Sequence, residues 1–130
     1  MSQMGIQIHG KSATKKQGNG RRNTKFRDKR RSEVGNYFSA TKLADSNVNA
    51  DIRRRGGKAA VRLKRASTAN LLTKDGYKKV KITGVLESKD NRNFARQNII
   101  TKGCTIITEL GNAVVVNRPG REGCINAKLV

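Results

Sequence analysis

The order of apolar and polar residues divides the chain into two parts of different character. Before residue 47, apolar side chains are few and follow no sustained period. After it, short alternating runs are separated by turn residues at close intervals, which is typical of short β-strands. No segment has the spacing of an amphipathic helix. We therefore predict an irregular extension over residues 1–46 and a β domain over residues 47–130.

Three pairs of these runs predict β-hairpins. The first is joined at a double glycine, which supplies the positive φ angles of a tight turn. The three predicted hairpins and their turns are residues 52–65 around Gly56-Gly57, residues 68–86 around Lys74-Asp75-Gly76, and residues 104–117 around Leu110-Gly111-Asn112. In the first, Val61 and Leu63 alternate with Arg62 and Lys64, which predicts one core face and one cationic face.

Shorter signals complete the predicted domain. Ile99 and Ile100 begin a short strand that ends at Lys102-Gly103, Arg118-Pro119-Gly120 predicts a turn, and residues 123–130 form a last strand. Residues 41–45 have the pattern of one helical turn. Seven or eight short antiparallel strands with few aromatic residues favour a mainly β fold, a small closed or partly closed β-barrel with an aliphatic core.

The net charge of the chain indicates a polyanionic partner. The chain carries 29 Lys and Arg against 9 Asp and Glu, a net charge of +20, and residues 1–67 hold 18 of the basic side chains against 4 acidic ones. A compact domain with this excess repels itself unless a polyanion neutralises it. Nucleic acid fits better than an anionic membrane, because the basic segment lacks the apolar helical face of interfacial binders.

The densest charge lies between residues 11 and 31, where ten basic side chains face one acid, Asp28. This arm has too little apolar surface to order its own backbone, so we expect it to be disordered until it binds. Its candidate phosphate ligands are Lys11, Lys15, Lys16, Arg21, Arg22, Lys25, Arg27, Lys29, Arg30 and Arg31.

A second group of candidate phosphate ligands surrounds the first hairpin. Its members are Arg53, Arg54, Arg55, Lys58, Arg62 and Lys64, and we add Lys102 and Arg118 from later turns. The alternative is a solvated edge whose charge discourages aggregation. Tyr37 and Phe38 could stack on unpaired bases or simply anchor the arm to the domain.

Catalytic chemistry has little support. The acids after residue 67 form no close pair, and neither cysteine has a histidine partner, since His9 lies in the N-terminal extension. No metal or phosphate-loop motif occurs, and no cofactor is expected. Cys104 and Cys124 are expected to be buried thiols, although a disulfide is geometrically possible. No apolar run could span a membrane, and the N-terminus lacks a secretion signal.

Several separate motifs in order resemble one protein family. They include Asn98-Ile99-Ile100-Thr101-Lys102-Gly103, residues 117–123 (Asn-Arg-Pro-Gly-Arg-Glu-Gly), Ile125-Asn126-Ala127 and Arg54-Arg55-Gly56-Gly57. They resemble the S8e family of archaeal and eukaryotic small-subunit ribosomal proteins, and the short length is similar to that of the archaeal form.

The resemblance implies a non-catalytic structural constituent of the small ribosomal subunit in the cytoplasm, with a β-barrel core and an N-terminal extension threaded into rRNA. Its partners would be small-subunit ribosomal RNA and neighbouring small-subunit proteins, with no membrane and no small-molecule substrate. The alternative function is that of a free β-barrel protein binding chromatin or single-stranded nucleic acid. That alternative predicts more exposed aromatic residues than the chain provides.

Overall fold

The chain divides into two compact units, residues Met1–Phe38 and Ser39–Val130. The computed structural model describes residues 8, 9, 14, 20–22, 27, 28 and 30–130. The second unit includes β1 (Lys42–Leu43), which pairs with a strand of the same unit.

In the first unit, short backbone contacts connect segments that are distant in sequence. A 3-10 turn, η1 (Arg31–Glu33), is its only helical element among the described residues. Ile8 forms an antiparallel bridge with Val34, and the His9 amide donates to the Glu33 carbonyl at 2.7 Å. Thr14 and Arg22 form a second bridge.

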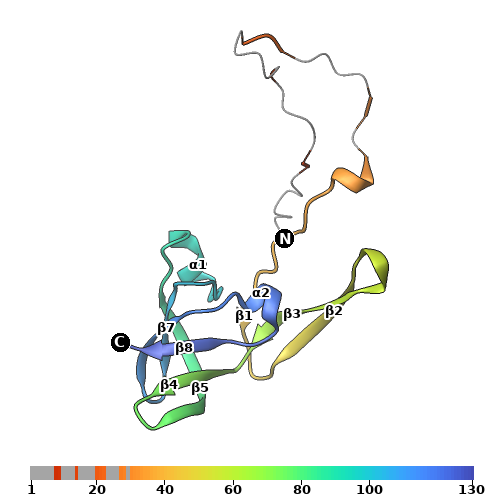
Figure 1. Cartoon of the computed structure of the whole chain (residues 1–130). Coiled ribbons are helices and arrows are strands. Elements are labelled where there is room, and N and C mark those ends of the chain that lie inside the picture. Colours follow the sequence, from red (N-terminus) through yellow and green to blue (C-terminus); the bar gives the residue numbers. More distant parts are fainter. Residues whose placement is uncertain (1–7, 10–13, 15–19, 23–26, 29) are drawn as a thin grey trace. The chain divides into compact units, whose positions relative to one another are not determined.

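The second unit contains a closed five-stranded barrel, which confirms the predicted fold class (Figure 1). Its strands follow one another around the barrel in chain order: β4 (Thr68–Thr73), β5 (Gly76–Glu87), β6 (Thr105–Thr108), β7 (Gly111–Val115) and β8 (Asn126–Leu129). Neighbours in this series are antiparallel, so the first and fifth strands run in the same direction. Closure therefore requires a parallel pair, and β4 and β8 provide it.

A three-stranded sheet extends from the barrel, in the order β1, β3 (Ala59–Ala66), β2 (Val48–Arg53). The chain passes directly from β3 to β4 through Ser67. The Asn47 side chain fixes this corner, because its Oδ1 accepts from the Ser67 amide at 2.7 Å and its Nδ2 donates to the Thr68 hydroxyl at 2.9 Å.

Aliphatic side chains and Cys104 form the core, and no aromatic ring is among them. Alternation accounts for most of this core, as on β5, where Val80 and Ile82 are buried while Lys79 and Lys81 are exposed. The largest fully buried side chains include Leu71, Ile100, Ile106 and Ile125. Register shifts between β5 and β6 on either side of Gly84 and Val85 bend this long strand around the barrel, as a glycine in a barrel strand predicts.

All three predicted hairpins are confirmed, with shifted ends. The first joins β2 to β3, the second joins β4 to β5 with Thr73 opposite Gly76, and the third joins β6 to β7 with Thr108 opposite Gly111. The last strand is shorter than predicted, because residues 123–125 belong to the loop that precedes β8.

Three local predictions are wrong, and one short helix was not predicted. The predicted helical turn at residues 41–45 contains β1, whose position depends on β3. Ile99 forms only an isolated bridge with Lys42, because Asn98 turns the chain with φ 52°. Pro119 begins a one-turn helix, α2 (Pro119–Glu122), since proline suits the first helical position. A second short helix, α1 (Arg92–Arg96), follows Asn91, whose side chain caps it at 3.0 Å.

The predicted faces of β3 are correct for Leu63 and Lys64 but wrong for Val61 and Arg62. Arg62 is buried at 4% exposure while Val61 is 40% exposed, and only Leu63 lies in the core as expected. The register with β2 is unbroken from Ala59 to Leu63, so Arg62 lies on the opposite face from Leu63, and its burial shows that this second face is covered too. Segment 39–41 also covers this part of β3, where the buried Thr41 hydroxyl donates to the Leu63 carbonyl at 2.6 Å.

The two cysteines have different environments, which corrects the prediction that both are buried. Both are free thiols, with Cys104 fully buried and Cys124 exposed. Burial raises the pKa of the Cys104 thiol, so its reactive thiolate is disfavoured.

We expect a disulfide reagent at pH 8 to modify one thiol of the native protein rapidly and the second only after denaturation. The reason is that Cys124 is accessible while Cys104 is enclosed by the barrel. Cys124→Ser should abolish the rapid phase in a stopped-flow absorbance measurement. Equal rates for both thiols in the native protein would contradict this assignment.

Candidate nucleic-acid interface

The β2–β3 hairpin concentrates positive charge at its tip. Arg53, Arg54, Arg55 and Lys58 are all exposed there, and the 3-10 turn η2 (Arg55–Gly57) presents the central part of the loop. The Arg54 amide donates to the Lys58 carbonyl at 2.6 Å and closes the loop. Because the hairpin projects from the barrel (Figure 1), its tip can approach a phosphate backbone from more than one side.

The turn geometry depends on the double glycine. Gly56 and Gly57 have φ angles of 76° and 72°, a region that side chains with a Cβ rarely occupy. A Cβ built on either residue meets nothing within 4 Å. The glycines are therefore needed for the backbone conformation of the tip and not for packing.

A second group of positive charge lies at the other end of β3, where this strand pairs with β1. Lys42 of β1 lies opposite Arg65 of β3 in a parallel pair, and both side chains are exposed. Like charges on directly opposite residues of neighbouring strands destabilise a sheet. An anion bound between them would remove this cost, so the pair points to an anionic partner. Sequence reasoning missed both residues, because only the β1–β3 register brings them together.

The loop that holds α2 adds Arg118 and Arg121 to the second unit's cationic surface. Asn117 organises this loop: its Nδ2 donates to the Glu122 carboxylate and to the Cys124 carbonyl, each at 2.8 Å. Its Oδ1 accepts from the Asn126 amide at 2.9 Å. These bonds hold Pro119 buried and leave the two arginines exposed.

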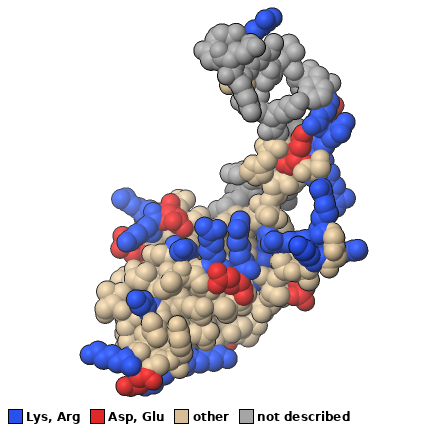
Figure 2. Space-filling view, viewed as in Figure 1, with Lys and Arg blue, Asp and Glu red and all other residues tan. Residues whose placement is uncertain are grey.

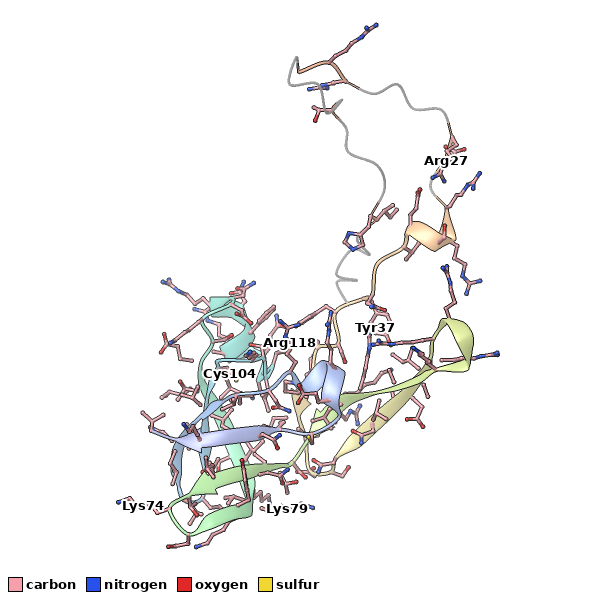
Figure 3. The ribbon with its side chains drawn as sticks, in the orientation of Figure 1. Arg27, Tyr37, Lys74, Lys79, Cys104 and Arg118 are labelled. Carbon is pink, nitrogen blue, oxygen red and sulfur yellow. The ribbon has the colours of Figure 1, made fainter. Side chains whose placement is uncertain are left out.

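Two glycines let α2 approach its neighbours closely. A Cβ on Gly120 would lie 3.0 Å from the Ser39 Cβ, and a Cβ on Gly123 would lie 2.9 Å from Cγ1 of Val61 on β3. The motif over residues 117–123 thus docks Arg118 beside β3. Arg118 is labelled near α2 in Figure 3, and Figure 2 shows Lys and Arg side chains gathered between α2 and the β2–β3 hairpin.

The remaining predicted ligands of this unit divide by exposure. Lys64 and Lys102 are exposed. Arg62 was predicted to lie on an exposed cationic face, but it is buried. Lys102 belongs to a turn in which Gly103 has a φ angle of 82°. The Gly103 amide donates to the Val115 carbonyl at 2.8 Å.

In the first unit, the structure describes five of the ten arm candidates. Arg21, Arg22, Arg30 and Arg31 are exposed, and Arg27 is partly buried in an ion pair with Glu33. The Arg30 amide and the Arg27 guanidinium hold the pKa of Glu33 below its ordinary value. The other five predicted ligands lie outside the described residues: Lys11, Lys15, Lys16, Lys25 and Lys29.

In the described part of the chain, no three His, Cys, Asp or Glu side chains gather as metal ligands would. None of its helices has the length and apolar character needed to cross a membrane.

Tyr37 and Phe38 are 46% and 41% exposed. Stacking on unpaired bases and anchoring of the arm to the domain both stay predictions for these two side chains.

Gly123→Ala should destabilise the fold more than Gly57→Ala. Both glycines have φ near 72°, so both variants incur the left-handed backbone cost of about 1 kcal/mol. Only Gly123 has a side chain, Val61, within 3 Å of a built Cβ, which adds overpacking of about 1–3 kcal/mol. Urea unfolding of the two variants measures the difference, and equal losses would show that α2 is not docked closely on β3.

Comparisons with known proteins agree with one another. The sequence profile of the family described as "Ribosomal protein S8e" matches residues 10–130. The "Small ribosomal subunit protein eS8" of Hyperthermus butylicus is 43% identical over 129 residues, covering 98% of this chain and 93% of that protein. The protein of the same name from Sulfolobus acidocaldarius is 47% identical over 108 residues, covering 82% of this chain and 84% of the relative.

Proposed function

The chain belongs to the ribosomal protein S8e family, and from this premise we propose that it is a structural constituent of the small ribosomal subunit. In this role it binds and stabilises folded small-subunit rRNA and contacts neighbouring subunit proteins, with no catalytic step of its own. The relatives named above carry the small-subunit assignment in their names.

One observation carries the RNA-binding part of the proposal: the second unit exposes basic side chains at the hairpin tip (Arg53, Arg54, Arg55, Lys58), at the β1–β3 pair (Lys42, Arg65) and beside α2 (Arg118). Among the described residues, no ion pair involves any of these seven side chains. Their charge is therefore available for phosphates, which provide affinity and position without sequence information. The three-dimensional shape of folded rRNA would supply the specificity.

The N-terminal arm adds to this binding in the proposal. In this proposal the arm becomes ordered when it binds RNA. The loss of conformational entropy reduces the net free energy of binding. If arm and hairpin together neutralise about ten phosphates, affinity should fall roughly as the seventh to ninth power of salt concentration.

We expect chemical footprinting to reveal protection of small-subunit rRNA when the full-length protein is added. The protein should also sediment with the small subunit after a moderate salt wash, since its contacts are distributed over many charges. Protection of unrelated RNA to the same extent, with none specific to small-subunit rRNA, would contradict the proposal and favour a free nucleic-acid-binding protein.

Replacing Arg53, Arg54 and Arg55 with Ala should lower rRNA affinity and reduce the salt slope by about 2 to 3, because each lost phosphate contact removes roughly 0.7–0.9 from it. Filter binding at several salt concentrations measures the slope. The fold should persist, as all three side chains are exposed.

The matched control is the triple variant Lys89→Ala, Arg92→Ala, Arg96→Ala, which removes the same charge from exposed residues at and before α1. It should change the slope less than the hairpin variant. Equal slopes for the two variants would mean that only net charge matters and that the hairpin is not a specific phosphate contact.

A further inference from the structure

The outer face of β4 and its neighbours differs from the cationic surface described above. Register places Tyr77 of β5, Leu72 of β4 and Lys128 of β8 in one row across three strands. The next row contains Lys79, Asn70 and Asn126. These six residues point outward, because their strand neighbours Leu71, Val80 and Ala127 are buried in the barrel. We call them the β4 face.

Tyr77 is the most exposed aromatic residue among the described residues, at 73%. Leu72 lies directly opposite it on the neighbouring strand. In water, an exposed ring on a sheet face contributes nothing to the core. It offers a flat surface on which a nucleobase can stack.

Polar and charged groups on the β4 face suit the rest of a nucleotide. The Asn70 Nδ2 donates to the Asn126 Oδ1 at 3.1 Å, which fixes both amides and leaves the Asn70 Oδ1 and Asn126 Nδ2 to face a base edge. Lys79 extends away from the barrel (Figure 3), and within the described residues neither Lys79 nor Lys128 forms an ion pair. None of the six is acidic, and the nearby Asp75 of the turn lies 3.7 Å from Lys78.

From this arrangement we propose that the β4 face binds an unpaired nucleotide segment of RNA, with a base stacked on Tyr77 and phosphates at Lys79 and Lys128. A protein partner would gain no charge complementarity from these lysines unless it were acidic. The inference rests on the proposed function. It adds base stacking on single-stranded RNA to the phosphate contacts of the hairpin. The hairpin surface, by contrast, has no aromatic side chain at its tip.

Tyrosine fluorescence tests the proposal on the full-length chain. The sequence has two tyrosines and no tryptophan, so Tyr37→Phe leaves Tyr77 as the only tyrosine reporter. We expect a single-stranded RNA of about ten nucleotides, within the usual site sizes, to quench this emission. A duplex of the same sequence should quench it much less, because its bases are already paired and stacked.

Affinity measurements separate stacking from other effects. Tyr77→Ala should weaken binding of the single strand about tenfold, whereas Tyr77→Phe should retain it, because stacking needs the ring and not the hydroxyl. Lys79→Ala should weaken binding and lower its salt slope. Leu86→Ala is the matched control, an exposed apolar side chain on β5 outside these two rows.

Unchanged Tyr77 emission at saturating single-stranded RNA, or equal affinities of Tyr77→Ala and wild type, would overturn the inference. Different results would show that the proposed function itself is wrong. The wild-type protein would then not associate with small-subunit rRNA, and the Arg53–Arg55 variant would show no altered salt slope.

Discussion

The parallel pairing of β4 with β8 is the contact on which the second unit depends. The five barrel strands are otherwise connected by antiparallel pairs of neighbours in sequence, so without this pair the sheet would be open. Its hydrogen bonds include Asn70 N to the Ile125 carbonyl at 2.8 Å and the Asn70–Asn126 amide contact. Closure removes both free edges and encloses Leu71, Ile106 and Ile125 in an aliphatic core. A core of this size supports a domain of modest stability, which a bound polyanion would increase.

Closure also determines where the family motifs act. The motif over residues 117–123 contains one predicted phosphate ligand, Arg118. In the structure it is mainly an architectural element: Asn117 organises the loop, Pro119 is buried, and Gly123 lies against Val61. Similarly, the motif over residues 98–103 fastens β1 to the barrel, because the Asn98 carbonyl accepts from the Leu43 amide and the Ile100 amide donates to the Thr41 carbonyl. The motifs therefore hold the binding surfaces in place more than they form them.

The charge distribution explains why this architecture suits an RNA partner. Lys42 and Arg65 lie opposite each other, and four basic side chains gather at one hairpin tip, so the free protein has repulsions that an anion would relieve. The β4 face adds an aromatic ring and two amides, and none of its six residues is acidic. One small domain can thus present a phosphate-binding surface on its hairpin and, in our inference, a base-stacking surface on its barrel.

The sequence by itself determined the fold class, the three hairpins and the basic hairpin tip, because strand alternation and turn glycines are local signals. Val80 and Ile82 alternate with lysines, and Gly56-Gly57 requires positive φ, whatever the rest of the chain does. Tertiary structure alone decided the burial of Arg62, the exposure of Cys124, the start of the second unit at Ser39 and the pairing of Lys42 with Arg65. These features depend on covering segments and on pairing between residues far apart in the chain. Such contacts produce no periodic pattern of apolar and polar residues, because the interacting residues come together only in the folded protein.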